Sequence, residues 1–393
     1  MARVATPARR GYDGVVLTAP VTVPYRRFSS ESGHWWLGRA LRGVCDAAGI
    51  DRDDIDGLAA ASFTIAPDTA IGLAEHFGIV PRWLDHVAVG GASGIVSLRR
   101  AARAVEAGDA TIVACIAGDT NAPDSFRRTV EGFSRFSEDA VYPYGAGGPN
   151  MSFALIARHY MNRTGATRED FGRLCIAQRD NALRNPDALM KKPLTMEAYL
   201  AARPIADPIH LYDCVMPCAG AEAFLVMRAA TAAALGLPFV RLLSAIERHN
   251  AFPDEPVQER GGWAMDADEL YAMAGIGPED IDFIETYDDY PVISMMQFED
   301  LGFCTKGEGP AFVRAHDFRV GGDLPHNTSG GQLSVGQASA AGGHLGLVEA
   351  IRQLLGTAGG TQVEGARTGL VSGFGMINYA RGIATGAAIL GAA

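Results

Sequence analysis

Two places in the second half of the chain carry side chains that can move a proton. Tyr287 lies in the run Glu285-Thr286-Tyr287-Asp288, and His326 stands next to Asn327. A histidine ordinarily titrates near pH 6.5, which suits a general base at neutral pH. A tyrosine, with a pKa near 10, serves as donor or acceptor when its surroundings adjust it. These residues are candidates for proton-transfer chemistry, although His326 equally fits a loop histidine that is hydrogen-bonded to backbone.

The cysteines do not form a pattern that indicates a metal site or a disulfide framework. Cys214 and Cys218 are four residues apart, but no second Cys or His pair follows at zinc spacing. Structural thiols in a reducing cytoplasm are therefore the expectation. The six positions are 45, 115, 175, 214, 218 and 304.

The glycine-rich segments Gly330-Gly331 and Gly342-Gly343 do not match the glycine spacing of phosphate-binding or dinucleotide-binding loops. We expect them to permit close backbone approach at the N-termini of helices. Backbone N–H groups there could form an oxyanion hole.

An internal repeat organises the elements around these residues. Ala48-Gly49-Ile50 and Asp54-Ile55-Asp56 recur as Ala274-Gly275-Ile276 and Asp280-Ile281-Asp282, each 226 residues later (48 to 274, 56 to 282). Further along, a helix from 91 to 108 with a strand at 111–118 has a counterpart in a helix from 339 to 356 and a strand at 368–373. The strand runs are continuously apolar, which is typical of a sheet covered on both faces.

These patterns predict an α/β fold with two similar halves packed together. The first half would have its core in residues 1–119, and the second would span 239–393. Residues 120–238 look like an insertion that also contains the end of the first half, with a helix near 170–183. Insertions on a rigid scaffold often shape a binding site.

Charge and hydropathy exclude several classes of function. The 34 Lys and Arg against 45 Asp and Glu give a net charge of −11, which disfavours nonspecific binding to nucleic acid or to anionic membranes. No run approaches the ~20 apolar residues that span a bilayer, and the N-terminus lacks the apolar core of a signal peptide. We expect a cytoplasmic protein.

With these features in hand, the chain resembles the thiolase superfamily, and in particular thiolases of the sterol-carrier-protein-x type, over essentially its whole length. The matching stretches occur in family order, which makes the resemblance specific and implies the thiolase fold. They are Gly91-Ala92-Ser93-Gly94, Asn150 through Pro208, Asp213 to Glu222, Glu285-Thr286-Tyr287-Asp288, Leu301-Gly302-Phe303-Cys304, Asn327-Thr328-Ser329-Gly330-Gly331 and Ser372-Gly373-Phe374-Gly375.

The resemblance also shows that the thiolase machinery is incomplete. Thiolases take up an acyl group on a cysteine at a helix N-terminus, activate it with a histidine and shuttle the α-proton with a second cysteine. This chain has Gly91 at the first position, Gln337 at the second and Val371 at the third, while the Asn is kept as Asn327. We expect none of its six cysteines to lie where it could substitute. Ser93 is the nearest hydroxyl, and helix capping is its expected role.

Relatives that lack the cysteine include the retro-aldolases of steroid side-chain breakdown, which split a β-hydroxyacyl-CoA without a covalent intermediate. In them a tyrosine at position 287 looks catalytic, and a second tyrosine would fall at Gln337, where this chain departs. The resemblance implies that Tyr287, His326 and Asn327 surround the reacting carbon. The residues expected to contact the substrate are Gly91, Ser93, Tyr290, Gln337 and Gly373.

Three functions follow as hypotheses. The first is a lyase acting on a C–C bond of an acyl-CoA, with the thioester as substrate and no cofactor. The second is an acyl-transfer component with a nonstandard nucleophile, and the third is an inactive subunit that supports a partner. The resemblance implies a homodimer, and a heteromeric complex with a small acyl-CoA-binding β-barrel partner.

Overall fold

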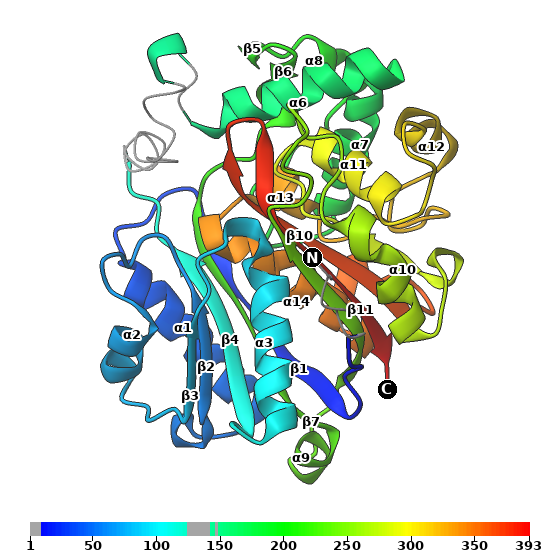
Figure 1. The fold of residues 1–393 in the computed structure, drawn as a ribbon. Coiled ribbons are helices and arrows are strands. Elements are labelled where there is room, and N and C mark those ends of the chain that lie inside the picture. The colour runs from blue at the N-terminus through cyan, green and yellow to red at the C-terminus, as the bar shows by residue number, and fades with distance from the viewer. Residues whose placement is uncertain (1–8, 124–141, 146–147) are drawn as a thin grey trace, which may run out of the picture.

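The computed structural model describes residues 9–123, 142–145 and 148–393. Its core is a nine-stranded sheet in the order β3-β2-β4-β7-β1-β8-β11-β10-β9 (Figure 1). The strands are β1 (Val15–Arg26), β2 (Gly57–Ala61), β3 (Trp83–His86), β4 (Ile112–Asp119), β7 (Ala219–Arg228), β8 (Val240–His249), β9 (Phe283–Glu285), β10 (Thr368–Asn378) and β11 (Arg381–Ala392).

The two halves of this sheet mirror each other about the junction of β1 and β8. In the first half, β3, β2 and β4 are parallel, and β7 and β1 follow antiparallel. In the second half, β9 and β10 are parallel, and β11 and β8 follow antiparallel. The short antiparallel pairing of β1 with β8 joins the halves into one continuous sheet. The predicted repeat of two similar halves is therefore confirmed.

Two helices, α3 (Ser93–Ala107) and α14 (Gly342–Leu355), form the central layer. Their apolar residues share one buried cluster with strands from both halves of the sheet. Each helix ends at a glycine in the left-handed region, Gly108 at φ +79° and Gly356 at φ +70°, where a side chain would be strained. These are the two helices that the repeat predicts, with their ends where the sequence places them.

The N-termini of α3 and α14 approach so closely that neither position tolerates a side chain. A Cβ at Gly94 would lie 1.9 Å from the carbonyl oxygen of Gly343, and a Cβ at Gly343 would lie 2.7 Å from the carbonyl oxygen of Gly91. The predicted role in close backbone approach is therefore confirmed for Gly343, and Gly94 has the same role.

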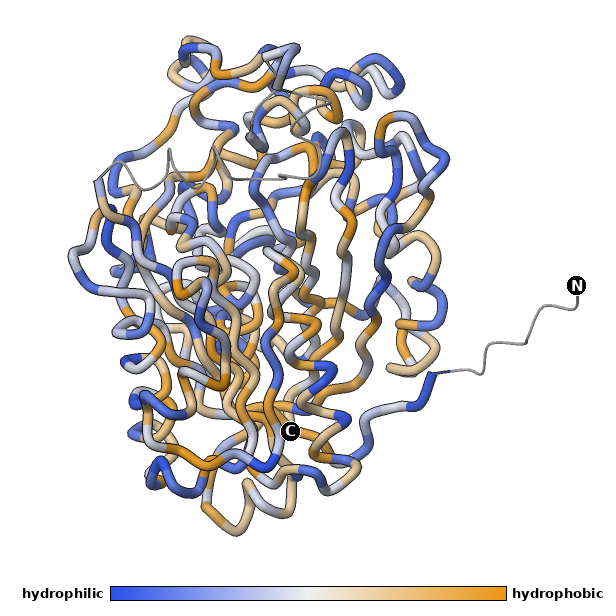
Figure 2. The backbone as a smooth tube through the Cα atoms, turned by 60° about the vertical axis from the view of Figure 1, so that its left-hand side comes forward, coloured by the Kyte–Doolittle hydropathy of each residue, from blue (hydrophilic) through white to orange (hydrophobic). Residues whose placement is uncertain are grey.

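Further helices cover the outer faces of the sheet. In the first half α1 packs on β1, β4 and β7, and in the second half α10 packs on β8 and β11. Hydrophobic residues follow the central strands and helices, while hydrophilic residues follow the periphery (Figure 2). These outer helices are α1 (Gly33–Ala48), α2 (Ala70–Phe77), α9 (Ala229–Ala234) and α10 (Trp263–Ala274). Three further helices pack against α7 (Arg168–Ala182) of the inserted segment: α11 (Pro291–Asp300), α12 (Gly309–Ala315) and α13 (Gly331–Val335).

The segment between β4 and β7 adds a layer above the carboxyl ends of the parallel strands (Figure 1). Thr167 and Asp170 form a capping box that begins α7, close to the predicted helix at 170–183. Positions 124–141 and 146–147 of the predicted insertion lie outside the described residues. The elements of this layer are α6 (Pro149–Thr164), α7 (Arg168–Ala182), α8 (Met196–Leu200) and the hairpin β5 (Pro204–Ala206) and β6 (Ile209–His210).

No helix among the described residues is both long enough and apolar enough to cross a membrane.

The close contact of the central helices gives a stability prediction. Gly94→Ala forces a methyl group onto the Gly343 carbonyl, so we expect the free energy of unfolding to fall by about 1–3 kcal/mol or more. Gly72→Ala in α2 is the matched control, because its nearest neighbours would be 3.9 Å away and alanine favours a helix. Denaturant unfolding measures both variants, and equal stability of the two would contradict the packing.

Candidate active site

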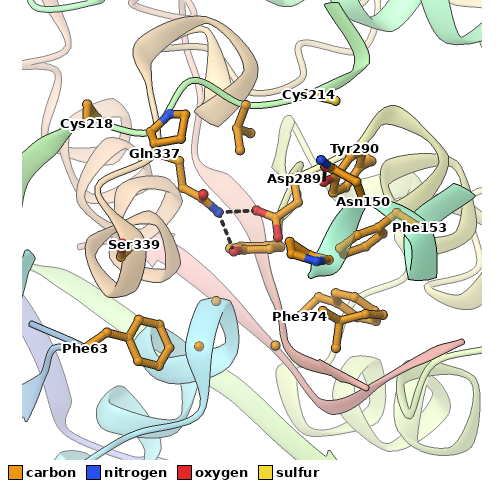
Figure 3. Close-up of a pocket in the computed structure, with 18 of the residues that line it drawn as sticks. Phe63, Asn150, Phe153, Cys214, Cys218, Asp289, Tyr290, Gln337, Ser339 and Phe374 are labelled. Carbon is orange, nitrogen blue, oxygen red and sulfur yellow. Dashed lines mark hydrogen bonds between the residues drawn. The ribbon is translucent and has the colours of Figure 1, made fainter. Parts of the chain in front are cut away.

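A cavity of about 340 Å³ opens where the carboxyl ends of β2, β4, β9 and β10 meet the inserted layer. Ligands of α/β proteins commonly bind at this edge of the sheet. Its walls are mostly apolar and aromatic (Figure 3). The lining includes Phe63, Gly91, Asn150, Phe153, Arg203, Ile205, Cys214, Val215, Cys218, Tyr287, Asp289, Tyr290, Gln337, Ser339, Phe374 and Gly375.

Tyr287 and Gly91 face each other at the floor of the cavity. A Cβ on Gly91 would lie 1.9 Å from Cε2 and 2.0 Å from Cζ of Tyr287, and 2.4 Å from the carbonyl oxygen of Phe374. The phenol ring therefore occupies the volume that a side chain at position 91 would need. A nucleophile at 91 and a tyrosine at 287 in this rotamer exclude each other.

The hydroxyl of Tyr287 belongs to a small polar group with Asp289 and Gln337. The amide nitrogen Nε2 of Gln337 donates to Oδ1 of Asp289 at 2.5 Å and to Oη of Tyr287 at 3.2 Å (Figure 3). One side-chain amide thus holds a carboxyl and a phenol together at the cavity wall.

Burial sets the charge state of both partners. Burial first, and then the nearby Asp289, raise the pKa of Tyr287 well above its ordinary value, so Tyr287 stays a neutral phenol at neutral pH. Burial also raises the pKa of Asp289 to about 7, against the lowering effect of hydrogen bonds from Tyr287 and Gln337. The pair offers a proton donor, Tyr287, beside a carboxyl that exchanges protons near neutral pH.

Asp288, unlike the adjacent Asp289, does not line the cavity. Its carboxylate accepts hydrogen bonds from the backbone N–H of Gln332 at 3.0 Å and of Leu333 at 3.2 Å. It therefore caps the start of α13 and is buried, with a pKa raised by burial to about 6. Asp288 fixes the loop that presents Tyr287 and Asp289.

His326 does not reach the cavity, which corrects its expected place at the reacting carbon. The side chain is fully buried between the rings of Phe298 and Phe318, and its Nε2 lies 2.7 Å from Oγ1 of Thr286. Burial lowers the pKa of His326 to about 3, so the imidazole is neutral. Its geometry is that of a structural histidine beneath the loop carrying Tyr287.

Asn327 is also removed from the main cavity. Its N–H donates to the carbonyl of Ile284 at 2.9 Å, and its side chain lines a separate space of about 10 Å³ behind Tyr287. That space has room for no more than about one water molecule. Asn327 thus lies behind the phenol ring and not beside a substrate in the cavity.

The residues expected to contact substrate divide into two groups. Gly91, Tyr290 and Gln337 line the cavity, whereas Ser93 and Gly373 do not. Ser93 is fully buried, and its hydroxyl donates to the carbonyl of Val87 at 3.0 Å and accepts from Val89 N–H at 3.3 Å. Both bonds go to the loop before the helix, and the N-cap of α3 is Ala92 without a side-chain bond, so the expected helix-capping role of Ser93 is wrong. Gly373 packs under Gly91, where a Cβ would lie 3.0 Å from the Gly91 carbonyl oxygen.

Tyr290 belongs to an aromatic wall. Its ring stacks on that of Phe153 with centroids 4.0 Å apart, and its hydroxyl donates to Oδ1 of Asn150 at 2.5 Å. Phe374 continues the wall below Phe153. Such a surface suits a bulky apolar group.

Two of the six cysteines lie at the site. Cys214 and Cys218 both line the cavity, on the inserted segment that leads into β7. Burial raises the pKa of Cys214 to about 12 and raises that of Cys218 further, so both remain neutral thiols. Neutral thiols are weak nucleophiles, and neither has the environment of an activated cysteine.

Asp289 was missed as a reactive group. Two consecutive acids follow Tyr287, and no local pattern shows that the first, Asp288, binds the backbone of Gln332, 44 residues later. The other is left at the cavity.

Comparison with known proteins agrees with this architecture. A family profile described as "Thiolase C-terminal domain-like" matches residues 247–389. The chain is 35% identical to the 17-hydroxy-3-oxo-4-pregnene-20-carboxyl-CoA lyase of Mycobacterium tuberculosis, over 84% of this chain and 89% of the relative. It is 32% identical to the steroid side-chain-cleaving aldolase of Thermomonospora curvata, over 84% of this chain and 88% of the relative. The chain belongs to the thiolase superfamily.

Solved structures show the same fold. The Ltp2-ChsH2(DUF35) aldolase superposes with a TM-score of 0.83 at 27% identity, covering 96% of this chain and 98% of that one. The acetyl-CoA acetyltransferase of Syntrophomonas wolfei superposes with a TM-score of 0.70 at 16% identity, covering 96% and 99%. The predicted thiolase fold is confirmed.

The contact between Gly91 and Tyr287 predicts a coupling in stability. We expect Gly91→Ala to lower the free energy of unfolding by about 1–3 kcal/mol, because the methyl group overlaps the phenol ring. Tyr287→Ala removes the ring. The loss of unfolding free energy in the double variant should therefore be smaller than the sum of the two single losses, by about 0.5–3 kcal/mol. Removing the ring relieves only part of the overlap, because the Phe374 carbonyl oxygen would still lie 2.4 Å from the Cβ at position 91. Denaturant unfolding of all four proteins measures the coupling, and strict additivity would contradict it.

Proposed function

We propose that this chain cleaves a C–C bond of a β-hydroxyacyl-CoA by retro-aldol chemistry, without an acyl-enzyme. One observation carries the proposal: the ring of Tyr287 fills the space in which a thiolase needs its nucleophile, and it brings a phenol to the same point. Retro-aldol cleavage needs an acceptor for the hydroxyl proton and a donor for the developing enolate, but no nucleophile.

Tyr287 is the donor in this reaction. Its raised pKa keeps the phenol protonated at neutral pH, as a donor must be. The hydrogen bond from Gln337 fixes the hydroxyl at the cavity. When the C–C bond breaks, the electron pair moves onto the thioester enolate, and the phenol supplies a proton to its α-carbon.

The apolar wall supports a bulky acyl group as the substrate. Phe153, Tyr290 and Phe374 present a broad aromatic surface next to the polar group. The two lyases named above act, by their names, on a steroid carboxyl-CoA and on steroid side chains. We therefore propose a fused-ring or aryl β-hydroxyacyl-CoA as the substrate that binds in this cavity, and the cytoplasm as the location of the protein.

The assembly is part of the proposal. The aldolase of similar structure is named as a complex of two proteins, Ltp2 and ChsH2. We propose that this chain forms a homodimer and joins a small partner that binds the CoA thioester. The thioester is the substrate, and no cofactor takes part in the chemistry.

The reaction is tested with 17-hydroxy-3-oxo-4-pregnene-20-carboxyl-CoA and with 3-hydroxy-3-phenylpropanoyl-CoA, using the purified chain with its co-purifying partner. We expect a ketone or aldehyde plus a shortened acyl-CoA, with the protein mass unchanged. Tyr287→Phe should lower kcat by about 100-fold or more, because the proton donor is lost. Mass spectrometry of the thioesters and of the protein measures both.

The matched control is Tyr271→Phe, which removes a phenol hydroxyl bonded to the Leu301 carbonyl, far from this cavity. It should cost stability and leave the rate unchanged. Acylation of the chain with release of free CoA would contradict the lyase and favour acyl transfer. Absence of turnover and of adduct, with the partner present, would favour a supporting subunit.

A further inference from the structure

We propose that Asp289 accepts the proton of the substrate's β-hydroxyl and that Gln337 is its positioning residue. This inference rests on the proposed lyase function and deepens it, since it assigns the base that the loss of a second tyrosine at position 337 leaves open. Asp289 and Gln337 both line the cavity, and they are joined by the 2.5 Å hydrogen bond from Nε2 to Oδ1.

Asp289 is the one carboxyl among the described residues of the cavity wall. The adjacent Asp288 points away, with its oxygens occupied by the backbone of α13. His326 is sealed behind Phe298 and Phe318. No histidine lies among the described lining residues, so Asp289 is the group there with the ordinary chemistry of a base.

The groups around Asp289 explain its proton affinity. The described titratable groups of the wall are Arg203, Cys214, Cys218, Tyr287 and Tyr290, and Asp288 lies directly behind. The two thiols and both phenols stay neutral, because burial raises their pKa values. Burial and the charge of Asp288 raise the pKa of Asp289, and Tyr287 and Gln337 lower it, to a result of about 7.

Gln337 cannot titrate, so it can act only by holding other groups. Its own backbone is fixed on both sides, because its N–H donates to the Met216 carbonyl at 2.9 Å and its carbonyl accepts from Cys218 N–H at 3.0 Å. The amide then reaches Asp289 and Tyr287 together. These two hydrogen bonds hold the Asp289 carboxylate beside the Tyr287 phenol at the cavity wall, where the proposed reaction needs both groups.

The proton balance closes without an outside reagent. The β-hydroxyl gives its proton to the Asp289 carboxylate as the C–C bond breaks and the carbonyl product forms. The bond's electron pair passes to the α-carbon, which takes the phenol proton of Tyr287. The proton on Asp289 then returns to Tyr287, so both side chains end as they began.

Asp289→Asn tests the base, since the amide keeps the shape and can still accept the bond from Gln337. With the two β-hydroxyacyl-CoA probes above, we expect wild-type kcat/KM to fall as pH falls through about 7, when Asp289 becomes protonated. Asp289→Asn should lower kcat/KM by about 100-fold or more and abolish this acidic limb. Asp268→Asn, at an exposed position of α10, is the control and should behave as wild type.

Two more variants keep the test independent of folding losses. Asp289→Ala should regain part of its rate when formate is added, because a free carboxylate can enter the vacated space. Gln337→Ala should lower kcat about 10-fold or more and move the acidic limb to higher pH, because the lost hydrogen bond had lowered the pKa of Asp289. If Gln337 had only a structural role, the acidic limb of the pH profile would stay at the same pH.

The outcomes separate the two proposals. If wild type cleaves a probe while Asp289→Asn stays within about threefold of it and keeps the acidic limb, Asp289 is not the base and the lyase function stands. An unmoved limb in Gln337→Ala would overturn the positioning role. If wild type with its partner cleaves neither probe, the lyase function fails, and this inference fails with it.

Discussion

The packing of the Tyr287 ring against Cα of Gly91 is the contact on which the rest of the site depends. The ring lies so close that even a Cβ at position 91 would overlap it by well over an ångström. The phenol ring in this position and a nucleophilic side chain at position 91 therefore exclude each other. The reactive hydroxyl, its carboxyl partner and the amide that joins them are all arranged around a ring held in that place.

The fold supplies this position through its symmetry. The carboxyl ends of equivalent strands from the two halves meet at the cavity, and α3 and α14 begin side by side next to it. The glycines at 91, 94 and 343 let these backbones touch. Tyr287 arrives from the loop after β9, while the inserted segment closes the cavity and clamps Gln337 through Met216 and Cys218. Three separate parts of the chain thus converge on one polar group.

Much of this could be predicted from the sequence, because it depends on pattern. The repeat with its glycine-terminated helices predicts the two halves, and the departures at Gly91 and Gln337 predict a site without thiolase chemistry. Side-chain direction has no such pattern. His326 lies on the expected loop, but its side chain packs into an aromatic core. Asp288 and Asp289 are adjacent in the sequence, yet Asp288 accepts hydrogen bonds from the backbone of α13 and Asp289 lines the cavity. Cys214 and Cys218 reach the wall along an irregular segment whose path no periodicity determines.

In the proposed reaction, bond cleavage proceeds through an enolate that Tyr287 protonates, and no acyl-enzyme forms. The direct measurement is the reaction run in D₂O without free CoA, with mass spectrometry of the shortened acyl-CoA. We expect cleavage under these conditions with one solvent deuterium at the α-carbon, and we expect Tyr287→Phe to lose this product. Cleavage that requires added CoA, with an acyl group found on the chain, would contradict it.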